Sequence, residues 1–165
     1  KRMPTKKFDK KLYEDADPLS KGIMSSWLSK HGYTHINPEE TYGVDIVCKK
    51  VDIPCYFETE IKYGWKGEWP NSWNEIRIPY RKLKIVQKWM REGSNGALTF
   101  VIFRSDCEQA WFIDGITVFR ADVEKVSNKY VSNEKFFHID VNDAHIINMG
   151  DIDPFNDIKN REYPS

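Results

Sequence analysis

The sequence predicts a single α/β domain in which helices pack against a sheet. Apolar residues recur at helical spacing over residues 18–30, and the pattern then changes to the alternation of strands between residues 44 and 62. Helical spacing returns over residues 80–92 and is followed by further apolar strands. With 165 residues, 40% hydrophobic and 30% charged, the chain has the size and composition of one globular domain.

The first helix is predicted over residues 18–30. Asp17 and Pro18 are typical of an N-cap followed by proline at the first helical position, and Gly32 supplies a stop signal. Residues 34–37 are then expected to form a short extended piece. The segments before and after the predicted elements, residues 1–16 and 151–165, are expected to be mobile tails.

Two strands, over residues 44–49 and 54–62, are close enough along the chain to form a hairpin. Residues 63–79 hold three tryptophans, two glycines and two prolines, and are predicted to form an ordered loop, which at this length is usually functional. Tryptophans in such a loop can stack on nucleic-acid bases, but for Trp65, Trp69 and Trp73 alike we favour packing in the core.

A second helix is predicted over residues 80–92, and strands over residues 97–103 and 109–113. The first of these two strands is nearly continuous in apolar residues, which is typical of a central strand. Beyond it, residues 118–126 are expected to form a further helix and residues 136–149 an extended segment.

Cysteine usage and hydropathy bear on the compartment. Cys48, Cys55 and Cys107 are odd in number and lack the paired spacing of a zinc site or a disulfide framework, so a reducing, intracellular setting is favoured. We expect all three to be small buried hydrophobic side chains rather than nucleophiles. No apolar run approaches the roughly 20 residues of a membrane helix. The chain is therefore expected to be cytoplasmic.

Charge is unevenly distributed, although the net charge is zero. Residues 62–91 carry eight Lys and Arg against two Glu, a net charge of +6. Residues 106–165 carry twelve Asp and Glu against six Lys and Arg, a net charge of −6. This separation favours a basic face that could meet nucleic acid, and the alternative is that the charges only solvate two surfaces.

The first hairpin carries the residues of chemical interest. On a strand, side chains two positions apart share a face, so Glu58, Glu60 and Lys62 are expected to project together. Asp45, on the neighbouring strand, can lie opposite that row, because paired Cβ atoms are about 5 Å apart. Aspartate is disfavoured in an apolar strand, and Asp45 lies between Val44 and Ile46. Binding of a metal ion would explain its presence there.

These residue types suit phosphodiester hydrolysis. A hard cation such as Mg²⁺ or Mn²⁺ takes carboxylate oxygens, and we assign Asp45 and Glu60 as its ligands, with the carbonyl of Ile61 as a further candidate. Lys62 would orient or activate the attacking water and stabilise negative charge on the phosphate. The alternative for Glu60 and Lys62 is an ordinary surface ion pair. Glu58 could join the site, although a solvated role paired to a lysine is slightly favoured.

Residues 43–47 (GVDIV) and 57–62 (FETEIK) resemble the core of the PD-(D/E)XK nucleases, a superfamily that includes restriction enzymes, Holliday-junction resolvases and small phage nucleases. The resemblance implies an α/β core with a mixed central sheet flanked by helices, and a metal-dependent DNA endonuclease. By position, Asp45 matches the metal-binding aspartate, Glu60 the second acid and Lys62 the lysine. The proline of the motif is replaced by Val44.

The resemblance leaves one acid unassigned. Many members carry an acid on the first helix, but residues 18–30 hold none, so Asp17, Glu39 and Glu40 are the candidates. If the chain is phage-encoded, the compartment would be the host-cell cytoplasm. The alternative function is a nucleic-acid-binding or structural module that keeps the fold without catalysis. Cutting both strands of a duplex also suggests a homodimer.

DNA is the expected partner, held by basic side chains of the loop and the second helix. The candidates for phosphate contacts are Lys66, Arg77, Arg81 and Lys82. A second cluster near the C-terminus, with His138, Asp140, Asp143 and His145, has the residue types of a transition-metal site. Since its ligand spacing is weak, we favour an exposed edge strand there.

Overall fold

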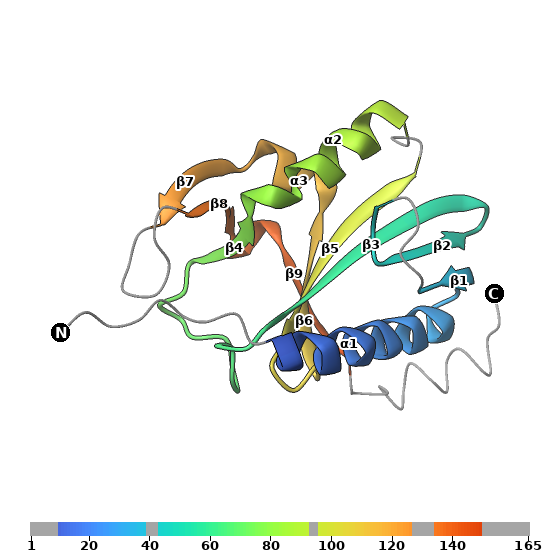
Figure 1. Cartoon of the computed structure of the whole chain (residues 1–165), viewed down its shortest axis with the longest axis horizontal. Coiled ribbons are helices and arrows are strands. Elements are labelled where there is room, and N and C mark those ends of the chain that lie inside the picture. The colour runs from blue at the N-terminus through green and yellow to red at the C-terminus, as the bar shows by residue number, and fades with distance from the viewer. Residues whose placement is uncertain (1–9, 39–42, 93–95, 127–133, 150–165) are drawn as a thin grey trace.

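A computed structural model describes residues 10–38, 43–92, 96–126 and 134–149, which form two sheets and the helices packed on them (Figure 1). The six-stranded sheet has the order β1-β2-β3-β5-β6-β9, and the three-stranded sheet has the order β4-β8-β7. The helical elements are α1 (Lys10–Lys30), η1 (Tyr80–Lys82), α2 (Leu83–Glu92), α3 (Gly115–Arg120) and η2 (Val141–Asp143). The strands are β1 (Thr34–Asn37), β2 (Ile46–Lys50), β3 (Ile53–Lys62), β4 (Glu75–Pro79), β5 (Ala97–Arg104), β6 (Gln109–Asp114), β7 (Asp122–Val126), β8 (Glu134–Asp140) and β9 (His145–Asn148).

The large sheet is mixed, because β3 and β5 run parallel while β2 and β6 pair with them antiparallel. The prediction of a mixed central sheet flanked by helices is confirmed. β5 lies between β3 and β6, as its apolar run predicted, with Phe100, Val101, Ile102 and Phe103 all buried. No helix among the described residues is long and apolar enough to cross a membrane.

Helices cover both faces of the large sheet. In Figure 1, α1 lies along one face, whereas α2, α3 and the small sheet lie on the other. The two buried clusters follow this division: Phe57 of β3 packs with Met24 and Leu28 of α1, and Tyr56 packs against the cluster that contains Val86 and Trp89 of α2. Successive β3 residues therefore face opposite layers, and Glu58, Glu60 and Lys62 share the face of Tyr56.

The predicted start of the first helix is wrong. α1 begins at Lys10, so Asp17 is not its N-cap, and Pro18 lies within the helix, where proline removes a backbone hydrogen bond. Residues 10–16 contain mostly good helix formers, which extends the helix into a segment that was expected to be a tail. The predicted stop is confirmed, since α1 ends at Lys30 and Gly32 has a φ of 85°.

Two further predictions need correction. The expected loop over residues 63–79 ends in the strand β4, in which Ile76 and Ile78 are buried while Glu75 and Arg77 are exposed. The expected helix over residues 118–126 is instead the short α3 followed by β7. Both new strands pair with β8, and this long-range pairing overrides the weak local pattern.

Candidate active site

Asp45 lies directly before β2 rather than inside it. Its Oδ2 atom accepts hydrogen bonds from the backbone N–H and the hydroxyl of Thr59, at 2.9 and 3.1 Å. Its Oδ1 atom lies 3.8 Å from the Lys21 amine of α1. These contacts hold the carboxylate over β3, where the hairpin and α1 meet.

The hairpin brings the segment before β2 close to Glu58. β2 pairs with β3 from Ile46 and Phe57 to Lys50 and Ile53, and the two-residue turn of Val51 and Asp52, with φ angles of 48° and 66°, sets this register. Asp45 lies one residue before the paired residues, near enough for its carboxylate to raise the pKa of Glu58.

Glu58 is buried, and its side chain contacts the Lys82 amine of η1. Burial raises the pKa of Glu58 to about 7; the Lys82 charge opposes this shift, and the Asp45 carboxylate adds to it. The Asp45 carboxylate thus lies near enough to Glu58 to affect the ionisation of Glu58. A cation between such groups would relieve their repulsion.

Glu60 is half-buried on the same face as Glu58. Burial raises the pKa of its carboxyl group, and the positive charges of Lys82, Arg81 and Lys62 oppose this shift. Glu134, at the start of β8, raises it further. Glu60 therefore lies in the field of three basic residues from two different segments of the chain.

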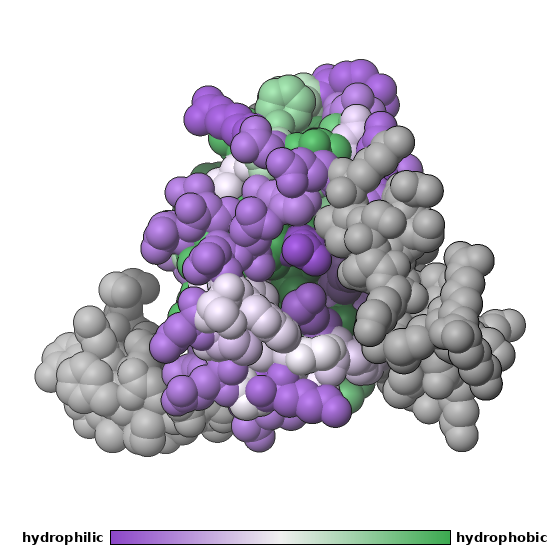
Figure 2. All heavy atoms as spheres, turned by 90° about the vertical axis from the view of Figure 1, so that its left-hand side faces the viewer, coloured by the Kyte–Doolittle hydropathy of each residue, from purple (hydrophilic) through white to green (hydrophobic). Residues whose placement is uncertain are grey.

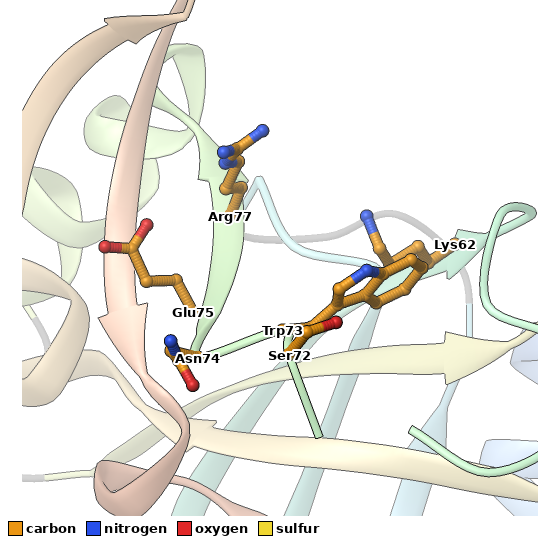
Figure 3. A pocket seen from close by; sticks show the side chains of 6 residues that line it. All are labelled: Lys62, Ser72, Trp73, Asn74, Glu75 and Arg77. Carbon is orange, nitrogen blue, oxygen red and sulfur yellow. The ribbon is translucent and has the colours of Figure 1, made fainter. Parts of the chain in front are cut away.

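Lys62 lies at the end of β3, with its amine 5.6 Å from the centre of the Trp73 ring. It also lines a cavity of about 440 Å³, here called the β3–β4 pocket, which is lined by Lys62, Ser72, Trp73, Asn74, Glu75 and Arg77. Figure 3 shows the Lys62 and Arg77 side chains extending to the same side of this pocket. Lys62 thus connects the strand that carries Glu60 with the β3–β4 pocket.

These carboxylates suit a divalent cation that takes only one or two ligands from the protein. Within the residues that the structure describes, no group of three or more His, Cys, Asp or Glu side chains is arranged to hold a metal. Mg²⁺ needs fewer, because one or two carboxylates with water and substrate phosphate complete its shell. Asp45 near Glu58, with Glu60 on the same face of β3 as Glu58, fits that requirement. Of the candidates for a further acid, Asp17 lies in α1, whereas Glu39 and Glu40 lie outside the described residues.

The basic residues expected to contact DNA differ in their surroundings. Lys66, Arg77 and Arg81 are exposed, and Arg77 projects from β4 into the β3–β4 pocket. Lys82 is only 16% exposed and pairs with Glu58, so its charge is directed to the carboxylates rather than to solvent. The position of Lys82 therefore favours interaction with the carboxylates, whereas its sequence context suggested a contact with DNA.

The prediction that Glu58 pairs with a lysine is confirmed, but the prediction that it is solvated is wrong, because Glu58 is buried. Lys82 was assigned only to DNA. A signal for the closeness of Glu58 and Asp45 was present: counting back from a two-residue turn at Val51 and Asp52 brings residue 58 near residue 45. Since Val-Asp is not a typical turn sequence, that register could not be recognised. No local signal pointed to Lys82, because its contact with Glu58 spans 24 positions of the chain.

The other candidate groups have structural roles. His138 lies in β8, the middle strand of the small sheet rather than an edge, and its Nδ1 atom lies 2.5 Å from Oε2 of Glu75. The cysteines Cys48, Cys55 and Cys107 are buried and free, as expected, and burial raises the pKa of Cys48 to about 12. A thiol with so high a pKa is a poor nucleophile at neutral pH.

The tryptophans of the loop separate into two kinds. Trp65 is fully buried and Trp69 packs against the same core cluster, so the core prediction is confirmed for these two. Trp73 is 37% exposed and lines the β3–β4 pocket, so the core prediction is wrong for it.

Comparison with known proteins adds a distant likeness at the level of the fold. The solved structure of Hjc, a Holliday junction resolvase from the archaeal hyperthermophile Archaeoglobus fulgidus, is similar to this chain with a TM-score of 0.49 and 13% sequence identity. The similarity covers 76% of this chain and 84% of the resolvase chain. No family model matches the sequence, and no curated protein matches it.

Proposed function

We propose that this chain is a metal-dependent deoxyribonuclease of the PD-(D/E)XK kind, acting as an endonuclease on DNA. The observation that carries the proposal is the position of Asp45 beside β3, where Thr59 holds its carboxylate close enough to Glu58 to raise the pKa of Glu58. Burying carboxylates close together is costly unless positive charge offsets them, and a bound cation would add to the charges of Lys82 and Lys21 there.

Asp45 and Glu60 would hold Mg²⁺ or Mn²⁺, with Glu58 as an additional carboxylate. When bound, such a cation lowers the pKa of a coordinated water and offsets charge on the phosphate. The Lys62 amine would orient the attacking water and donate a hydrogen bond to a phosphate oxygen. Lys82 favours the ionised form of both glutamates, which is the form that binds a cation.

Arg77, Arg81 and Lys66 would hold the DNA backbone beside these carboxylates, since all three are exposed cations. The Arg81 charge acts on Glu60, Arg77 lines the same pocket as Lys62, and Lys66 follows β3 in the chain. Because one site cuts one strand, a homodimer would be needed to cut both strands of a duplex in one encounter. The dimer is part of the proposal, as is the preference for DNA.

Removal of the metal is the first test. The purified chain is expected to nick supercoiled plasmid and to degrade linear or branched DNA with Mg²⁺ or Mn²⁺, and to leave all of them intact in excess chelator, because the carboxylates act only through the cation. Gel assays before and after chelation, with activity restored by added metal, measure this. Cleavage that persists at full rate in chelator would overturn the mechanism.

Arg81→Ala tests DNA binding separately from chemistry. Losing one phosphate contact should weaken binding several-fold and reduce the slope of log K against log salt concentration by about 1, since fewer counterions are released. Lys49→Ala, which removes an exposed lysine on β2, is the matched control and should leave both quantities unchanged. Anisotropy titrations of a labelled oligonucleotide at several salt concentrations give both values.

A further inference from the structure

The β3–β4 pocket has the features of a site for an unpaired nucleotide. Its volume of about 440 Å³ lies within the usual range for small-molecule sites. One side chain is a partly exposed tryptophan, two are basic, and two, Ser72 and Asn74, offer hydrogen-bonding groups. Aromatic rings with adjacent cations are what proteins use to hold single nucleotides, because every base has a face that stacks and every nucleotide carries a phosphate.

Trp73 is held in place as a platform. Its backbone N–H donates a hydrogen bond to the carbonyl of Pro70 at 3.0 Å, and its own carbonyl accepts one from the indole of Trp69 at 2.7 Å. The rings of Trp69 and Trp73 meet edge to face at 5.0 Å, and Trp69 in turn meets the buried Trp65 at 5.1 Å. This chain of contacts connects the exposed ring to the core, so stacking on it costs little ordering of the protein.

Two cations border the ring. The Lys62 amine lies 5.6 Å from the centre of the Trp73 ring, and Arg77 comes from β4 and extends to the same side of the pocket as Lys62 (Figure 3). The pocket also contains Glu75, but its carboxylate is directed to His138 of β8. The positive charge of Lys62 and Arg77 therefore dominates the side of the pocket on which a phosphate would lie.

The pocket lies beside the proposed catalytic strand. Lys62 is two residues from Glu60 on the same face of β3, so a phosphate held at Lys62 is close to the phosphate that the carboxylates would address. Figure 2 views the side of the molecule on which β4 lies, and hydrophilic side chains predominate on the part of this face that is coloured. Such a surface suits contact with a charged phosphate backbone.

We propose that the β3–β4 pocket binds one unpaired nucleotide next to the cut, with its base stacked on Trp73 and its phosphate between Lys62 and Arg77. The proposal rests on the proposed nuclease function and names its substrate class, which is DNA with unpaired nucleotides near the cleavage point, such as flaps, overhangs and open junctions. A base within a duplex must first leave its stack, which costs free energy, whereas an unpaired base does not.

Binding in chelator tests the pocket without relying on cleavage. The probes are a labelled 20-nucleotide single strand, the same sequence as a blunt duplex, and that duplex with a short unpaired flap. We expect Trp73→Ala to weaken binding of the single strand and the flap by about 10-fold or more, and to leave the blunt duplex unchanged. Trp73→Phe keeps an aromatic face and should restore most of the loss.

Phe119→Ala is the matched control, because Phe119 is an exposed aromatic residue of α3 (46% exposed) that does not line the pocket. It should bind all three probes like the parent. Thermal unfolding of each variant checks that folding is unchanged. Equal losses on all three probes, or no loss on the flap, would overturn the proposal.

The pocket and the nuclease can fail separately. If the parent does not cut any DNA with Mg²⁺ or Mn²⁺ but binds the flap through Trp73, the pocket is supported and the nuclease function is overturned. If the parent cuts blunt duplex as fast as flapped duplex and Trp73→Ala does the same, the nuclease function is supported and the pocket proposal is overturned.

Discussion

Asp45→Asn is expected to lower metal-dependent cleavage on the order of 100-fold or more, because a neutral amide is a much weaker ligand for a hard cation than a carboxylate. The fold should survive, since the remaining amide oxygen can still accept the hydrogen bonds from Thr59. DNA binding in chelator should be no weaker, because a carboxylate that repels phosphate has been neutralised. Plasmid nicking rates, thermal unfolding and DNA-binding titrations in chelator measure these three effects, and a Mn²⁺ titration measures metal affinity.

Asp52→Asn is the control for that substitution. Asp52 is an exposed residue of the hairpin turn with a φ of 66°, a conformation that asparagine tolerates well. The same change of charge in the same hairpin should therefore leave cleavage and Mn²⁺ affinity as they are in the parent. Should Asp45→Asn cut and bind Mn²⁺ like the parent, Asp45 would be a structural acceptor for Thr59, and the proposed metal site would be wrong.

Lys62→Ala should reduce the maximal cleavage rate by about 100-fold or more, because its ammonium acts on the transition state and on the attacking water. Lys62 is half-buried at a strand end, so the thermal unfolding midpoint should change little. Affinity for blunt duplex in chelator should stay close to that of the parent. Single-turnover rates at saturating enzyme separate this loss of chemistry from any loss of binding.

Lys82→Ala provides the comparison, because it removes the other ammonium near the glutamates. It leaves the buried Glu58 without its ion-pair partner, which should cost about 1–3 kcal/mol of unfolding free energy, measured in urea. Lys84→Ala, on the exposed side of α2, should change stability by less than about 0.5 kcal/mol. If Lys62→Ala cuts like the parent while folded Lys82→Ala is inactive, the catalytic amine is that of Lys82.

The alternative to a nuclease is a module that binds nucleic acid without cutting it. A nucleic-acid-binding module on the same fold would need Arg81 and the β3–β4 pocket but would gain nothing from buried carboxylates near a phosphate. Full retention of DNA binding, with no metal-dependent cleavage on any substrate, would support that module. The cost of burying Glu58 beside Asp45 favours the nuclease.

The sequence by itself determined the order of the main elements and singled out the first hairpin as the candidate site. The alternation over residues 54–62 predicted β3 to within one residue, and the apolar run of β5 predicted its central position. Gly32 marked the end of α1 correctly. These features follow from local patterns, periodicity and backbone conformation, which a chain expresses whatever packs against it.

Tertiary structure decided which of the charged residues meet. The hairpin register depends on an untypical turn at Val51 and Asp52, and the hairpin brings Asp45 near Glu58. The contact of Lys82 with Glu58 joins segments that are 24 positions apart, and Trp73 is exposed whereas Trp65 and Trp69 pack in the core. Likewise β4 and β7 exist because β8 pairs with both. Such long-range contacts leave no local pattern, because their energy comes from segments that are distant in the sequence.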